Sequence, residues 1–198
     1  MKVTRGDGLI EGFLARQRAK MVNSLISDRA RKGRILDIGC GTTPYFLVST
    51  RFQEKHGLEK VHETEEKELH GEKIFIRHYD IDNENRLPYD DGYFDVVTML
   101  AVFEHIDQTR LVKMLREICR VMKPGAQYVL TTPAAWTDSL LRLLAILGIV
   151  SKEEIQEHKG TYSHKEIKNL LVEAGFSEGR VQSGYFEAFM NLWVSVIK

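Results

Sequence analysis

The segment that most restricts the fold is residues 34–44, RILDIGCGTTP, in which an apolar run ends at a glycine-rich turn. The aliphatic residues suit a buried parallel strand, and Gly39 and Gly41 allow the backbone to turn sharply and approach a ligand closely. Asp37 adds a carboxylate near the end of this strand, where it could hold backbone amides or a cationic ligand. The segment therefore predicts a nucleotide-type site. An ordinary strand-to-helix turn is the alternative.

The rest of the chain alternates between strand and helix patterns. This alternation predicts an α/β fold with a doubly wound, mostly parallel seven-stranded sheet, helices on both faces and an antiparallel final strand. A helix over residues 9–31 precedes the first strand. We predict strands at 34–38, 56–60, 74–79, 94–100, 127–132, 177–182 and 189–197, and further helices at 45–52, 108–121, 136–150 and 163–174.

The size of the chain favours one domain. Its 198 residues, of which 43% are hydrophobic, supply enough apolar material for a single sizeable core. We assign residues 1–198 to one domain. Within it, residues 1–33 form an N-terminal helical cap, and residues 134–162 form a helical lid or substrate-side insertion.

Charge and cysteine content narrow the function classes. Lys and Arg together number 28, as do Asp and Glu, so no net positive charge favours a nucleic-acid partner. Cys40 and Cys119 lack the spacing of a disulfide framework or a zinc site, which favours a reducing compartment and predicts no metal. The longest apolar run, residues 143–150, is too short to cross a bilayer, and no signal peptide is evident. We therefore expect a cytoplasmic protein without a transmembrane segment.

Acidic residues follow two of the predicted strands. Glu59 lies twenty residues after Gly39, where a doubly wound fold places an acid on ribose hydroxyls. The alternative is that Glu59 belongs to the solvated charge run at 63–73. Asp80 and Asp82 follow the third strand and are expected to face the same crevice, or else to close a turn.

Four separated motifs together resemble the class I S-adenosylmethionine-dependent methyltransferases, in particular their small-molecule group. They are ILDIGCG at 35–41, LPYDDGYFDVV at 87–97, VFEHI at 102–106 and RVMKPGAQYVLTTP at 120–133. A softer match, HKGTYSHKEIKNLLVEAGF at 158–176, resembles the substrate-side ending of that family. The resemblance implies a Rossmann-like methyltransferase fold, with S-adenosyl-L-methionine as cofactor and S-adenosyl-L-homocysteine as product.

The resemblance also implies roles for individual residues. The cofactor loop would comprise Asp37, near the amino acid end of the ligand, with Gly39, Cys40 and Gly41. Glu59 would hold the ribose hydroxyls. The adenine would lie beside Asp80, Ile81 and Asp82, and the methionyl portion beside Leu100 and Ala101.

Methyl transfer from a sulfonium is an in-line displacement in which the cofactor carries the difficult chemistry. If a hydroxyl acceptor needs a general base, His105 is the first candidate, because it follows the fourth strand. A packing or capping role is its alternative. His158, Tyr162 and Trp136 are substrate-side candidates. The apolar helix at 136–150 could cover a small-molecule or lipid-like acceptor, contact a membrane surface or form a homodimer contact.

Two other functions stay open. An NAD(P)-binding oxidoreductase would need a complete G-x-G-x-x-G, and Pro44 occupies the place of the third glycine. A catalytically inactive cofactor-binding module of the same fold is compatible with Thr43, which replaces a glycine usual in the family.

Overall fold

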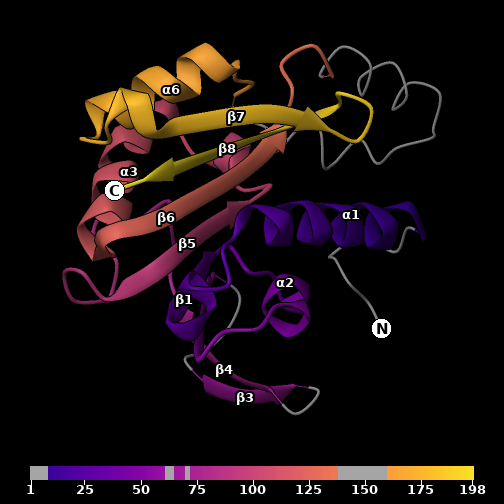
Figure 1. The fold of residues 1–198 in the computed structure, drawn as a ribbon, viewed down its shortest axis with the longest axis vertical. Coiled ribbons are helices and arrows are strands. Elements are labelled where there is room, and N and C mark those ends of the chain that lie inside the picture. The colour runs from indigo at the N-terminus through magenta and orange to yellow at the C-terminus, as the bar shows by residue number, and fades with distance from the viewer. Residues whose placement is uncertain (1–8, 61–64, 70–71, 138–159) are drawn as a thin grey trace.

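The computed structural model describes residues 9–60, 65–69, 72–137 and 160–198. Its centre is one eight-stranded sheet in the order β3-β4-β2-β1-β5-β6-β8-β7 (Figure 1). The strands are β1 (Arg34–Ile38), β2 (Glu54–Glu59), β3 (Glu65–Leu69), β4 (Glu72–His78), β5 (Phe94–Leu100), β6 (Met122–Pro133), β7 (Val181–Phe186) and β8 (Asn191–Ile197). The helices are α1 (Leu9–Leu25), α2 (Tyr45–Ser49), α3 (Gln108–Val121) and α6 (His164–Glu173), with 3₁₀ turns η1 (Ala30–Lys32), η2 (Phe103–His105) and η3 (Glu178–Arg180).

The strand directions confirm the predicted doubly wound topology. β1 pairs in parallel with β2 and β5, β2 with β4, and β5 with β6. The final strand, β8, is antiparallel to both β6 and β7. In such a sheet the carboxyl ends of the parallel strands share one edge, and a ligand crevice forms where the strand order reverses, here between β1 and β5.

The eighth strand is a correction to the expected seven. β3 pairs antiparallel with β4 at the edge of the sheet, within the stretch 63–73 that we expected to be a solvated charge run. An edge strand is held by backbone hydrogen bonds to one neighbour, so it does not need the alternating apolar pattern that identifies a buried strand.

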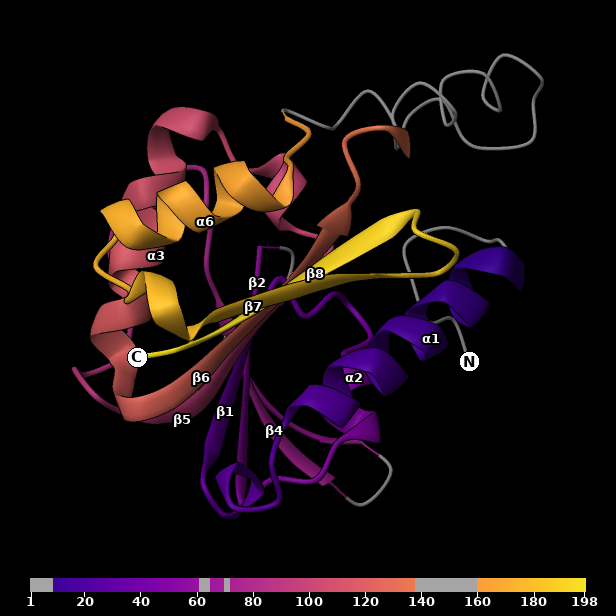
Figure 2. The same ribbon diagram turned by 45° about the horizontal axis from the view of Figure 1, so that its top comes forward.

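Helices cover both faces of the sheet. Figure 2 shows α3 and α6 on one side and α1 and α2 on the other. The larger core cluster lies under α3 and α6 and includes Leu115 and Leu171, while a second cluster lies under α1 and α2 and includes Val22, Ile35 and Leu47. The central strands therefore contribute apolar side chains to two cores at once.

Two helices are shorter than predicted. α1 ends at Leu25 instead of residue 31, because Arg31 folds back and donates to the carbonyl oxygen of Asn23 at 2.8 Å, satisfying a helix-end acceptor. The same guanidinium reaches Thr50 Oγ1 at 2.9 Å and so joins α1 to the segment after α2. α2 ends at Ser49 instead of residue 52.

The remaining elements agree closely with the sequence. β5 and α3 have the predicted bounds, and α6 begins with a capping box between Ser163 and Glu166. The stretch 178–180 forms η3, so β7 begins at Val181 instead of residue 177. Most of the predicted helix at 136–150, including its share of the proposed lid and dimer contact, lies outside the described residues.

Candidate active site

The turn after β1 needs both of its glycines. Gly39 and Gly41 have φ angles of 72° and 76°, in the left-handed region that glycine adopts most readily. A side chain at Gly39 would also clash with Val102, which follows β5. At Gly41 an added side chain would meet almost no protein atoms. The turn is therefore tightly packed at its first glycine and open at its second.

Asp37 is a buried carboxylate directly before this turn. Its side chain is 3% exposed, and the Thr98 hydroxyl donates a hydrogen bond to its Oδ1 atom at 2.6 Å. Burial raises the pKa of Asp37 to about 7, against the lowering effect of the Thr98 hydrogen bond. A cationic ligand group beside Asp37 would favour the ionised form, so the ammonium group of an amino acid fits this position.

Glu59 ends β2 and faces the glycine turn. It is 7% exposed, its Oε2 atom accepts from the Gly41 amide at 2.9 Å, and its Oε1 atom accepts from the Lys60 amide at 3.0 Å. This burial disagrees with a place in a solvated charge run. Each carboxylate oxygen has a second lone pair, so Glu59 fits ribose hydroxyls while it also orders the turn.

The acids after β4 are arranged around a tight turn. Asp80 accepts from the Asp82 amide at 3.0 Å and from the Asn83 side chain at 2.7 Å. Lys60, at the end of β2, lies 3.2 Å from Asp80 and 3.5 Å from Asp82. Asp80 therefore closes the turn, and Ile81 packs against the core beside it.

The end of β5 carries a strained residue and a buried acid. Ala101 has a φ angle of 55°, which is uncommon for a residue with a side chain, and its amide donates to the Thr131 carbonyl oxygen at 3.0 Å. Glu104 is buried in η2 and accepts a 2.9 Å hydrogen bond from Thr132 Oγ1. His105 follows it and is half-buried.

The substrate-side candidates differ in how far their side chains are buried. Tyr162 is buried, packs edge-to-face on Phe103 with ring centroids 5.0 Å apart, and has a pKa raised by burial. Trp136 is 51% exposed, and its indole nitrogen donates to the Phe189 carbonyl oxygen at 3.1 Å. His158 lies outside the described residues.

Three charged residues at this edge were not among the predicted site residues. Arg18 from α1 is faced by the carboxylates of Glu104 and Glu187. Glu104 could have been suspected from its place beside His105 in the VFEHI motif. Arg18 lies within the predicted helix at 9–31, and no local signal marked Arg18 or Glu187.

A family model described as a methyltransferase domain matches residues 10–178. The chain belongs to this methyltransferase family. This match confirms the resemblance to methyltransferases that the four motifs indicated. A comparison with curated protein sequences gives no match.

Solved structures give the same fold for this methyltransferase. A possible histamine N-methyltransferase from Thermotoga maritima is 19% identical with a TM-score of 0.67, and the match covers 96% of this chain and 91% of that one. A SAM-dependent methyltransferase from Archaeoglobus fulgidus is 17% identical with a TM-score of 0.62, covering 96% and 100% of the two chains. The YcgJ protein of Bacillus is 15% identical with a TM-score of 0.65, covering 92% and 98%.

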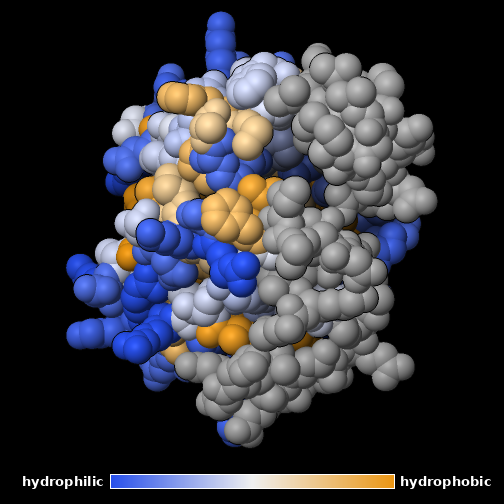
Figure 3. Space-filling model, turned by 90° about the vertical axis from the view of Figure 1, so that its right-hand side faces the viewer, coloured by the Kyte–Doolittle hydropathy of each residue, from blue (hydrophilic) through white to orange (hydrophobic). Residues whose placement is uncertain are grey.

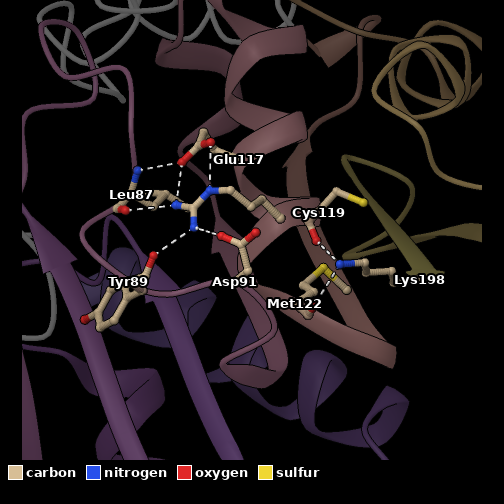
Figure 4. A network of polar contacts seen from close by, with 8 residues as sticks. Leu87, Tyr89, Asp91, Glu117, Cys119, Met122 and Lys198 are labelled. Atoms are coloured by element: carbon tan, nitrogen blue, oxygen red, sulfur yellow. Dashed lines mark hydrogen bonds and ion pairs between the residues drawn. The ribbon is translucent and has the colours of Figure 1, made fainter.

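The methyltransferase motif RVMKPG contributes a structural arginine. Arg120, near the end of α3, binds Glu117 at 2.7 and 2.9 Å and Asp91 at 2.7 Å (Figure 4). It also donates to the carbonyl oxygens of Leu87 and Tyr89 at 3.0 and 2.9 Å. The ion pairs raise the pKa of Arg120 above its usual value. This arginine fixes the loop that leads into β5, and so positions the β5 edge of the site.

A cavity of about 380 Å³ in the methyltransferase lies at the opposite edge of the sheet. Arg34, Asp95 and Lys123 line it, and Asp95 accepts from the Arg34 amide at 2.8 Å and from Lys123 at 2.6 Å. In the described part of the chain, no cluster of His, Cys, Asp and Glu is arranged to hold a metal ion. The helices described there include none long and apolar enough to cross a membrane.

Proposed function

We propose that the chain transfers a methyl group from S-adenosyl-L-methionine to a small-molecule or lipid-like acceptor by in-line displacement. The observation that carries this proposal is the convergence of Asp37 and Glu59 on the turn formed by Gly39 and Gly41. Two buried carboxylates beside an open glycine turn suit a ligand with a cationic amino acid end and ribose hydroxyls. Membership of the methyltransferase family supports this assignment.

Each part of the cofactor has matching residues at this edge. Asp37 would hold the ammonium group, Glu59 the ribose hydroxyls, and Cys40 would line the turn. Asp82 and Ile81 would flank the adenine, since Asp80 already closes its turn. Leu100 and Ala101, at the end of β5, would line the methionyl portion.

Orientation is the main contribution expected of the protein. The bound sulfonium supplies a methyl group activated by its positive charge. Holding the acceptor in line with that methyl group can supply roughly 7–11 kcal/mol, against about 3–5 kcal/mol from a general base. His105, half-buried after β5, is the candidate base for a hydroxyl acceptor. Its catalytic role stays a prediction.

Exposed apolar side chains support an acceptor with an apolar part. Phe189 in the β7–β8 turn is 66% exposed and lies against Trp136, which is 51% exposed. Figure 3 shows the face of the molecule that carries this turn and α1, where hydrophobic groups gather among hydrophilic ones. The homodimer through residues 136–150 stays a prediction.

Binding of S-adenosylhomocysteine and NAD, measured by calorimetry, tests the cofactor assignment. We expect the first to bind and the second not to bind. Glu59→Ala should weaken S-adenosylhomocysteine binding about 10- to 100-fold, because it removes a buried charged hydrogen-bond acceptor. Glu178→Ala is the matched control, since Glu178 is exposed in η3 and pairs only with Lys168 among described residues.

The outcomes separate the three candidate functions. Tight NAD binding without S-adenosylhomocysteine binding would instead support an oxidoreductase. S-adenosylhomocysteine binding without transfer of labelled methyl to a panel of phenols, amines, quinones and lipids would support an inactive cofactor-binding module. Unchanged affinity in Glu59→Ala, with the fold intact, would remove Glu59 from the site.

A further inference from the structure

Three charged groups from distant parts of the chain meet at the edge of the sheet where the acceptor is expected. Arg18 comes from α1, Glu104 from η2 after β5, and Glu187 from the β7–β8 turn. Both carboxylates attract the Arg18 guanidinium electrostatically and act to raise its pKa. In Figures 1 and 2, the β7–β8 turn lies near the amino-terminal half of α1. We call these three residues the edge cluster.

The hydrogen bonds of the edge cluster are incomplete. Glu104 accepts from Thr132, and Glu187 Oε2 accepts from the Asn191 side chain at 2.5 Å. Within the described part of the chain, Arg18 Nε and Glu187 Oε1 are buried and have no hydrogen-bond partner. Buried polar atoms are almost always paired in folded proteins, so one free donor and one free acceptor at one edge indicate a place for a polar ligand.

The charge of the edge cluster indicates the kind of ligand. Among the described residues of the edge cluster, two carboxylates act on one guanidinium, so these three groups carry an excess negative charge when all are ionised. Burial raises the pKa of Glu187, and the charge of Arg18 acts in the opposite direction. Burial lowers the pKa of Arg18, and the two glutamates act in the opposite direction. A buried charge without a full counter-charge is unfavourable, and a cationic ligand group would neutralise it.

We propose that the edge cluster is the polar end of the acceptor site and that it binds an ammonium group of the acceptor. The ammonium group donates to Glu187 Oε1, and a neighbouring polar atom of the acceptor accepts from Arg18 Nε. The exposed Phe189 follows Glu187 by two residues, and its carbonyl oxygen accepts from the indole of the exposed Trp136. Both rings offer contacts to an apolar part of the same compound. This inference rests on the proposed methyltransferase function and concerns recognition, not bond formation.

A series of probes matched in shape but not in charge tests this inference. The full chain is first saturated with S-adenosylhomocysteine, and binding of phenethylamine, 2-phenylethanol and phenylacetate is then measured by ligand-detected NMR. Phenethylamine should bind at least about tenfold more tightly than phenylacetate, because a buried carboxylate attracts the cation and repels the anion. The neutral alcohol should fall between them.

Two variants assign the preference to the edge cluster. Glu187→Gln keeps the size of the side chain but removes its charge, and should reduce the preference for phenethylamine to less than about threefold. Glu178→Gln, at an exposed glutamate, should keep the preference of the wild type. Binding of the three probes to the wild-type chain can be compared without any variant, so the inference remains testable if Glu187→Gln does not fold.

Several results would overturn the inference. These are equal or tighter binding of phenylacetate, no saturable binding of phenethylamine, or a preference that persists in folded Glu187→Gln. In each of these cases the edge cluster would only anchor α1. Because S-adenosylhomocysteine binding is measured first, its absence would reject the proposed function separately.

Discussion

At the scale of single residues, Asp37 shows a conflict between stability and function. Its carboxylate is buried beside the Thr98 hydroxyl, and burial raises its pKa to about 7 from a usual value of 3.8. The folded state therefore holds a proton over a pH range in which the unfolded chain has released it. Ionised Asp37 destabilises the fold, and a cationic ligand would offset that effect.

The pH dependence of stability tests this account of Asp37. As pH rises from the unfolded pKa to the folded pKa, the wild type loses stability through this group, whereas Asp37→Asn does not titrate. The stability of Asp37→Asn relative to the wild type should therefore increase by about 2–3 kcal/mol between pH 5 and pH 8, measured by urea unfolding. S-adenosylhomocysteine binding should weaken in the same variant.

The control for this measurement is Asp28→Asn, at an exposed carboxylate after α1. It should show almost no change relative to the wild type between the two pH values. A constant difference between Asp37→Asn and the wild type across this range would contradict the assigned burial effect.

At the scale of elements, one arginine joins the loop before β5 to the end of α3. Arg120 forms ion pairs with Glu117 and Asp91 and binds two carbonyl oxygens of the loop, at Leu87 and Tyr89. A planar guanidinium can satisfy all of these acceptors at once, which a lysine cannot. The position of β5, and with it Ala101 and Glu104, depends on this contact.

Removing that arginine should destabilise the fold. Arg120→Met removes one donor from Glu117, which keeps the Leu87 amide, and one donor from each of the two carbonyl oxygens. It should lower the free energy of unfolding by about 2–4 kcal/mol. Arg116→Met, one turn earlier on the exposed side of α3, should change it by less than about 0.5 kcal/mol. Chemical denaturation measures both. Equal effects of the two variants would show that the network contributes nothing specific.

At the scale of the whole molecule, the sheet joins two cores into one folding unit. Val22 belongs to the core under α1 and α2, and Leu171 to the core under α3 and α6. Because β1, β5 and β6 contribute side chains to both cores, loss of packing on one face weakens the other. The N-terminal helix therefore supplies part of the core, in addition to its predicted role as a cap.

Core substitutions on either face of the sheet should destabilise the protein in one common unfolding transition. Leu171→Ala should reduce the free energy of unfolding by about 2–5 kcal/mol, and Val22→Ala by about 1–3 kcal/mol, through cavity formation. Val172→Ala, at the exposed neighbour of Leu171, should have an effect below about 1 kcal/mol. Circular dichroism and tryptophan fluorescence should report one transition in every variant. Two separate transitions would contradict a single folding unit.

The sequence by itself determined the elements whose signals are local. Local patterns identify these elements within a few residues: the apolar runs of β1 and β5, the two glycines after β1 and the helical spacing of α3. β2 was predicted at 56–60 and spans Glu54–Glu59. The methyltransferase family followed from four such local motifs.

Only the tertiary structure decided which side chains meet across long separations in the chain. The charged segment of β3 became a strand because β4 offers it backbone partners, and Asp80 became a turn residue because its neighbours use both of its oxygens. Arg18 and Glu187 belong to opposite ends of the chain, and each shifts the pKa of the other. Local patterns encode burial and turns, whereas such contacts depend on how whole elements pack, so no short stretch of sequence contains them.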